Sequence, residues 1–157
     1  YPVKTRKLKR GARAHLPPDF AVPFGVARRR REGTELTIVS YGTAVHLALA
    51  AAERLAAEGR SVEVLDLRSL VPLDWEAIAR SVRKTSRVLV AHEDKVHGGF
   101  GGELAAQIGQ ELFAYLDAPV ARVGSEFTPV GFHRALERAI LPDADRVLDA
   151  ARRVLAY

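Results

Sequence analysis

Cysteine and methionine are both absent from this 157-residue chain, and long apolar runs are absent as well. Without cysteine the chain can form no disulfide, and no thiolate can act as a nucleophile or a metal ligand. No apolar stretch approaches the ~18 residues of a membrane-spanning helix, and the basic N-terminal region excludes the apolar core of a signal peptide. We therefore expect a soluble, cytoplasmic protein with no membrane partner. Because the first residue is Tyr1, we also expect a piece of a longer reading frame.

Positive charge is concentrated near the N-terminus. Residues 1–31 hold ten lysines and arginines against the single acid Asp19, whereas residues 32–157 hold 14 basic and 18 acidic residues. A nucleic-acid surface needs basic side chains on a folded face with aromatic residues between them. The basic cluster has only Tyr1 and Phe20 near it, so no nucleic-acid partner is predicted.

Prolines divide the chain into a linker and one domain. Residues 1–24 carry four prolines and no sustained hydrophobic period, which disfavours regular helix there. This segment is predicted to be a basic, extended linker. Residues 25–157 have the length of a single domain.

From residue 25 onward, apolar runs that suit buried strands alternate with segments of helical period. The expected strands cover 36–41, 62–67, 87–91 and 119–123, with a short edge strand within 25–31. Strands that alternate with helices are joined by right-handed crossovers, which make neighbouring strands parallel. We therefore predict an α/β domain of three layers, with a mainly parallel sheet of about five strands, helices on both faces and one antiparallel edge strand.

Helix boundaries follow from local signals. Thr43 and Asp74 each stand directly before a periodic segment, so each is predicted to cap a helix with its side-chain oxygen. Further helices are expected over 103–115, 132–140 and 143–155. The residues of the first helix expected to face the core are Val45, Leu49, Ala52 and Ala56.

Polar residues follow the third expected strand, at the edge of the sheet where open α/β proteins bind ligands. The tract begins with His92-Glu93-Asp94. A histidine beside two carboxylates has the residue types of a general base, or of a metal site together with His97. A glycine-bound turn separates the two histidines and no other His or Cys has matching spacing, so no metal ligand is predicted. The favoured role of His92 is a hydrogen-bonded side chain at a packed or subunit interface, with acid–base work as the lesser alternative.

The same tract continues with the glycine run Gly98-Gly-Phe-Gly-Gly-Glu103. Glycines at a helix start let backbone N–H groups approach a phosphate. A dinucleotide-binding fingerprint, however, follows the first strand and has a third glycine, whereas this run follows the third strand and lacks it. It also lacks the Lys and Ser/Thr of a P-loop, and Glu103 would repel an anion. No cofactor-binding residue is predicted.

Five stretches, in this order, resemble one family. They are Glu63-Val-Leu-Asp-Leu-Arg-Ser-Leu-Val-Pro-Leu-Asp74, Ser81-Val-Arg-Lys-Thr85, His92-Glu93 with its glycine run, Leu116-Asp-Ala-Pro-Val-Ala-Arg122, and Leu136-Glu137 with Pro142. Together they are similar to the C-terminal domain of the β subunit of thiamine-diphosphate-dependent 2-oxo acid dehydrogenases, which has the transketolase C-terminal fold. The resemblance covers about residues 22–157.

The resemblance implies a part of a multienzyme complex that decarboxylates a 2-oxo acid on thiamine diphosphate with magnesium and passes the acyl group to a lipoyl arm. It implies as partners the α part and the aminopyrimidine-binding domain of the same enzyme, a second β copy, and the lipoyl acyltransferase core. The chain has no Gly-Asp-Gly with a following Asn for magnesium diphosphate. No catalytic residue carries over, and the chain alone is expected to be inactive and to bind no cofactor.

The resemblance implies that residues of this chain form an interface and do not form a catalytic site. It implies subunit contacts at the strand-end motif and a contact of the acyltransferase core with the C-terminal residue and its carboxylate. The interface candidates are His92, Glu93, Gly99, Gly101, Glu103 and Tyr157.

Two other readings stay open. The first is the related C-terminal domain of a transketolase or a deoxyxylulose phosphate synthase, although His92 before the glycine run favours the dehydrogenase. The second is an independent flavodoxin-like module that binds an anion or a nucleotide. The substrate pocket would be built from other domains, so the sequence does not identify the 2-oxo acid.

Overall fold

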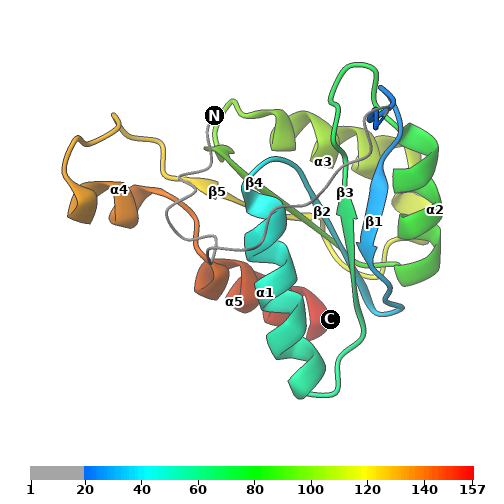
Figure 1. The fold of residues 1–157 in the computed structure, drawn as a ribbon. Coiled ribbons are helices and arrows are strands. Elements are labelled where there is room, and N and C mark those ends of the chain that lie inside the picture. The colour runs from blue at the N-terminus through cyan, green and yellow to red at the C-terminus, as the bar shows by residue number, and fades with distance from the viewer. Residues whose placement is uncertain (1–19) are drawn as a thin grey trace.

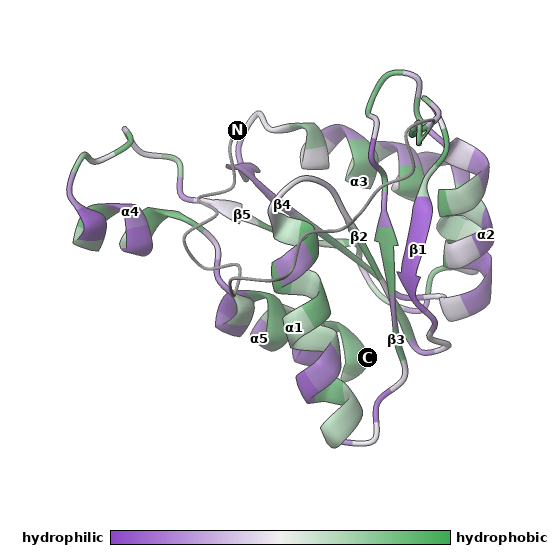
Figure 2. Ribbon diagram, in the orientation of Figure 1, coloured by the Kyte–Doolittle hydropathy of each residue, from purple (hydrophilic) through white to green (hydrophobic). Residues whose placement is uncertain are grey.

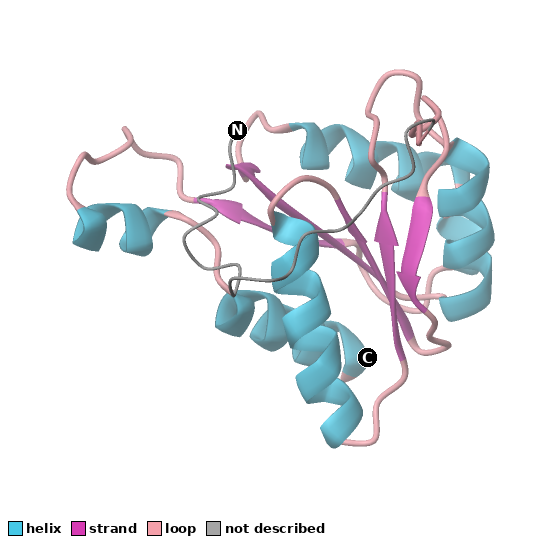
Figure 3. Cartoon of the chain, viewed as in Figure 1, coloured by secondary structure: helices cyan, strands magenta, loops and turns pink. Residues whose placement is uncertain are grey.

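The computed structural model describes residues 20–157 and contains one five-stranded sheet in the order β1-β3-β2-β4-β5. The strands are β1 Arg28–Arg31, β2 Leu36–Ser40, β3 Val62–Asp66, β4 Val88–Lys95 and β5 Ala121–Ser125. All neighbouring pairs are parallel except β1 and β3, which are antiparallel (Figure 3). The predicted mainly parallel sheet with one antiparallel edge strand is confirmed.

Helices cover both faces of this sheet (Figure 1). They are α1 Ala44–Ala57, α2 Trp75–Thr85, α3 Phe100–Glu111, α4 Arg134–Ile140 and α5 Ala144–Leu155, with a short 3-10 helix at Phe113–Tyr115. Two separate apolar clusters result, because α1 and α5 pack on one face of the sheet and α2 and α3 on the other. The three predicted layers are therefore confirmed. None of the helices within residues 20–157 is long and apolar enough to cross a membrane.

Strand β2 shows why helices must pack on both faces of the sheet. All five of its residues are buried, and successive side chains point to opposite faces. Ile38 joins the cluster under α1 and α5, while Val39 joins the cluster under α2 and α3. Thr37 points to the α2 side, where its hydroxyl lies 2.8 Å from that of Thr85. A parallel strand of this kind is stable only when both faces are covered.

Strand β1 forms the predicted edge. Its four residues are all arginines, and Figure 2 shows it as a hydrophilic strand at the side of the sheet. Arg29 lies 3.9 Å from the carboxylate of Glu63, a fully buried residue of β3 that also pairs with the ammonium of Lys84. The buried carboxylate on β3 thus has two cationic partners, one on each neighbouring element.

The first helix differs from its prediction in two ways. Thr43 precedes α1 but its side chain forms no capping hydrogen bond. The predicted inner face is also rotated, because Leu49 is only half-buried and Ala56 is exposed, while Ala48 and Leu55 are buried. Packing against α5 explains the rotation, since both buried residues belong to the cluster that contains α5.

Several boundaries around the strand-end tract also differ. β4 runs to Lys95 and not to residue 91, so His92 lies inside the strand. Pairing of Lys95 with Ser125 and the hydrogen bond from Val96 N–H to the Ser125 carbonyl at 3.0 Å hold this extension. β5 begins two residues later than predicted, after Pro119, which has no N–H to donate to a ladder.

Helix α3 begins at Phe100 and ends at Glu111, whereas 103–115 was predicted. Tyr115, the last residue of the predicted helix, lies in the 3-10 helix and is 47% exposed. The predicted basic linker falls mostly on residues 1–19, which lie outside the described residues.

Asp74 should contribute measurably to stability, because its carboxylate joins two elements. One oxygen accepts the Ala77 N–H at 3.1 Å and so caps α2 as predicted, and the other accepts the Ala27 N–H at 2.8 Å. Asp74→Ala is expected to lower the free energy of unfolding in urea by about 1–3 kcal/mol. Asp74→Asn keeps a capping oxygen and should lose less. Equal losses in the two variants would contradict this role.

Candidate functional site

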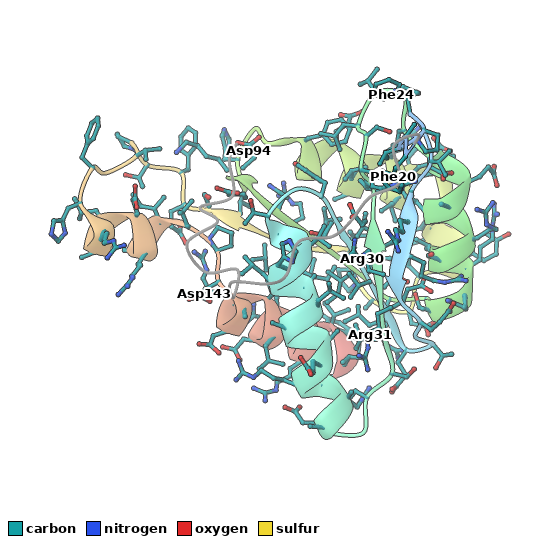
Figure 4. All side chains as sticks on the ribbon, in the orientation of Figure 1. Phe20, Phe24, Arg30, Arg31, Asp94 and Asp143 are labelled. Carbon is teal, nitrogen blue, oxygen red and sulfur yellow. The ribbon has the colours of Figure 1, made fainter. Side chains whose placement is uncertain are left out.

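The strand-end tract surrounds a buried imidazole. His92 on β4 is 0% exposed, and its ring lies parallel to that of Tyr41, which follows β2, with 5.9 Å between centroids. Tyr41 in turn meets Phe100, the first residue of α3, edge to face at 6.3 Å. Three elements therefore converge on one ring cluster, and Figure 4 places Asp94 just beyond it, at the tip of β4.

The glycines of the tract make room for this imidazole. A Cβ atom added at Gly101 would collide with Nε2 of His92, and one added at Gly124 of β5 would lie 2.8 Å from its Cε1. A Cβ atom at Gly99 would collide with the carbonyl oxygen of Lys95. The space beside these three glycines is therefore occupied by atoms of the chain itself.

Neither ring nitrogen of His92 forms a hydrogen bond of ordinary geometry among residues 20–157, but the Asp94 backbone lies close enough to raise the pKa of the imidazole, so hydrogen bonding of His92 stays a prediction. Burial lowers the pKa of the His92 imidazole; the Asp94 carboxylate opposes this effect and the Arg122 guanidinium adds to it. Burial, followed by the charge of Asp94, raises the pKa of Tyr41 to about 12. Both side chains are neutral near pH 7, and a buried neutral imidazole is poorly placed for proton transfer with a substrate.

The solvent-facing side of the tract is acidic. Glu93, Asp94 and Glu103 are exposed, and the Asp94 carboxylate accepts the Lys95 N–H at 2.7 Å. Carboxylates at this edge would repel a phosphate. The described part of the chain contains no group of three or more His, Asp or Glu side chains that could hold a metal ion.

The structure brings together three of the predicted interface residues, His92, Gly99 and Gly101, in the interior of the domain. Glu93 and Glu103 lie on the surface above them, where contact with another subunit stays a prediction. Sequence reasoning missed Tyr41 and Gly124, which complete the surroundings of His92. A glycine inside a strand marks close approach of another group, and this signal could have identified Gly124.

Tyr157 lies elsewhere, beside an apolar groove of about 550 Å³. Tyr157 and Phe113 both line this groove and are 72% and 75% exposed. The remaining lining residues are Ala105, Gly109, Leu116, Asp117, Ala118, Pro119 and Val120. Exposed aromatic side chains around an apolar hollow are typical of a protein interaction site. Tyr157 was an interface candidate from the sequence, whereas Phe113 was not identified.

His92 should make the domain less stable in acid. Its pKa is lowered by burial in the folded state, whereas the unfolded chain has the ordinary value of about 6.5. The unfolded state therefore takes up the proton first as the pH falls. The free energy of unfolding has its full value above pH 6.5 and decreases below pH 6.5, by up to about 1.4 kcal/mol per pH unit.

Urea unfolding between pH 7 and 5.5 checks this prediction. His92→Asn should flatten the pH dependence of the unfolding free energy, whatever its effect at pH 7. The matched variant His46→Asn changes an exposed histidine of α1 and should leave the slope as it is. An unchanged slope in His92→Asn would refute the assignment.

Comparison with known proteins matches residues 25–147 to the family model described as transketolase, C-terminal domain. The chain is 47% identical over 136 residues to the pyruvate dehydrogenase E1 component subunit beta of Leifsonia xyli, covering 87% of this chain and 40% of that protein. It is 46% identical over 134 residues to the 3-methyl-2-oxobutanoate dehydrogenase subunit beta of Mycobacterium tuberculosis, covering 85% of this chain and 38% of that protein.

Among solved structures, a split-gene transketolase in an inactive β4 tetramer superposes with a TM-score of 0.75 at 33% identity, over 90% of this chain and 45% of that one. The chain thus spans less than half the length of these relatives. The matched region contains the His92 cluster and all five strands. The chain belongs to the transketolase C-terminal domain family, and its relatives include the β subunits of pyruvate and branched-chain 2-oxo acid dehydrogenases.

Proposed function

We propose that this chain is the C-terminal structural and assembly domain of the β subunit, or β part, of the decarboxylating component of a 2-oxo acid dehydrogenase complex. The observation that carries the proposal is its 46–47% identity to pyruvate and branched-chain dehydrogenase β subunits over 85–87% of its length. The whole enzyme would decarboxylate a 2-oxo acid oxidatively and transfer the acyl group to a lipoyl group. The acid would be pyruvate or a branched-chain 2-oxo acid.

Thiamine diphosphate and magnesium would serve the whole enzyme, and the described residues of this domain do not fit them. The space beside Gly101 is filled by His92 and the space beside Gly99 by the Lys95 carbonyl, and the exposed residues Glu93, Asp94 and Glu103 place carboxylates on the surface of the tract. A diphosphate needs N–H donors or cations at such an edge. The cofactor is therefore proposed to lie between other domains, and no step of the reaction is assigned to residues of this chain.

The proposed partners are the α part and the aminopyrimidine-binding domain of the same enzyme, a second β copy and the lipoyl acyltransferase core. The relatives are named as subunits, and the structural neighbour is a β4 tetramer, which supports an assembly role. We propose a cytoplasmic location, as for an enzyme from a bacterium such as the Bacillus subtilis relative with 40% identity over 152 residues; the relatives from Arabidopsis thaliana and Caenorhabditis elegans are named as mitochondrial.

The first test exchanges the domain. Residues 25–157 replace the matching region of the M. tuberculosis subunit beta, and the chimera is produced with its α subunit and compared with the parent. Because the substrate pocket is proposed to lie in other domains, we expect the chimera to bind α and to retain at least about one-tenth of the parental decarboxylation rate.

Two results would count against the proposed function. One is a folded chimera that neither binds α nor turns over substrate. The other is saturable binding of thiamine diphosphate, flavin or ATP to the 157-residue chain in calorimetry, which would favour an independent ligand-binding module.

Within this function, the groove beside Tyr157 is the proposed contact for the lipoyl acyltransferase core. It is apolar, it ends at the chain's C-terminal residue, and its aromatic side chains Phe113 and Tyr157 are exposed. Buried aromatic side chains at the centre of an interface dominate its binding energy. Leu155, two residues earlier, is 9% exposed and belongs to the core cluster, so it contributes to folding.

Tyr157→Ala is therefore expected to weaken capture of the lipoyl acyltransferase core at least about tenfold, equivalent to ~1.4 kcal/mol. Phe113→Ala should act in the same direction. Val71→Ala is the matched control, because Val71 is 86% exposed and does not line the groove. Quantitative pull-down or surface plasmon resonance gives the affinities. Unchanged binding after Tyr157→Ala would exclude this contact.

A further inference from the structure

The segment from Glu126 to Pro142, here called the arm, extends away from the body of the domain (Figure 1, orange). It contains α4, and none of the seven residues of this helix is buried. The base of the arm is fixed, since the Glu126 N–H donates to the Ile140 carbonyl at 3.0 Å and the Glu126 carboxylate pairs with Arg146 at 2.6 Å. These contacts thus fix the base of the arm, while the residues of α4 are not buried by the rest of the described chain.

The arm exposes large apolar side chains. Phe127 is 71% exposed, Val130 69%, Phe132 fully and Leu136 55%. Figure 4 shows side chains of the arm extending away from the sheet. Several large apolar side chains exposed on one short segment indicate an interaction surface, whereas single ones would not.

A groove of about 570 Å³ lies between the arm and the end of β4. Its apolar part is formed by Val130, Ile140 and Leu141. Its acidic part contains Glu93 and Glu137, together with Asp94. The one cation in the lining, Lys95, donates to the carbonyl oxygens of Glu126 and Thr128. The groove therefore suits an apolar segment that carries positive charge.

The arm itself has the matching chemistry. Arg134 and Arg138 are exposed one helical turn apart on α4, next to the exposed Phe132. Neither arginine belongs to the ion pairs formed among residues 20–157. One chain thus carries both an acidic apolar groove and a basic apolar helix, which is the self-complementarity that a two-fold symmetric interface requires.

We infer that the arm is an interface with a second copy of this chain, in which Arg134 and Arg138 of each copy face the carboxylates of Glu93 and Glu137 in the other. The inference specifies a surface for the second-copy contact and rests on the proposed function in that respect. This surface is distinct from the groove beside Tyr157. One short helix and one groove bury less than the ~800 Å² per partner of a stable interface, so the isolated chain should associate weakly, with Kd between about 10 µM and 1 mM.

Charge exchange tests the inference on the 157-residue chain. Sedimentation equilibrium between about 5 and 500 µM measures association of the wild type, of Arg134→Glu/Arg138→Glu, and of Glu93→Arg/Glu137→Arg. Each double variant alone places like charges opposite each other and should associate at least about tenfold more weakly than the wild type. An equimolar mixture of the two variants restores opposite charges at both contacts, and we expect it to recover wild-type association.

The control is Arg28→Glu/Arg80→Glu, which reverses two exposed arginines outside the arm and should associate as the wild type does. Circular dichroism confirms that each variant is folded. A wild-type chain that stays monomeric, an unaffected double variant, or a mixture without recovery would each overturn the inference. Association is measured without catalysis, so failure here leaves the domain-exchange result unaffected, and failure of that exchange leaves the arm contact intact.

Discussion

The fit of the His92 ring between two glycines determines how α3 sits on the sheet. The ring occupies the space beside Gly101 of α3 and Gly124 of β5, and no other residue at either position leaves room for it. Tyr41 then stacks on the ring from the end of β2. The side chains of a tract with the residue types of an active site thereby serve packing, and the surfaces proposed for function are the groove beside Tyr157 and the arm.

The sheet was predictable because its signals are local and repeated. Strands β2 and β3 are apolar runs between glycines or charges, and Asp74 caps α2 as its sequence position indicated. Predictions failed where a distant element decides the outcome. The inner face of α1 depends on α5, and the length of β4 depends on Ser125 of β5, neither of which is visible in the neighbouring sequence.

The candidate site was predicted less well than the fold. The motif from His92 to Glu103 identified the family and predicted a histidine at a packed or subunit interface, but it did not show that the ring is buried inside the domain and stacked on Tyr41. Burial of a polar ring depends on which glycines and aromatic residues the fold brings together, and Tyr41 and Gly124 lie 51 and 32 residues from His92. Phe113, which lines the groove together with Tyr157, was missed for the same reason.

Strand β1 has a consequence for the edge of the sheet that it forms. An open sheet edge is a template on which other chains can pair and aggregate. Here the outer edge on the β3 side consists of four arginines, and pairing with β1 of a second copy would bring like charges together and remove them from water. The backbone of β1 completes the hydrogen bonding of β3, while the arginine side chains of β1 oppose the addition of a further strand. This side of the sheet is therefore protected against aggregation by the chain's own sequence, with no need for a neighbouring subunit to cover it.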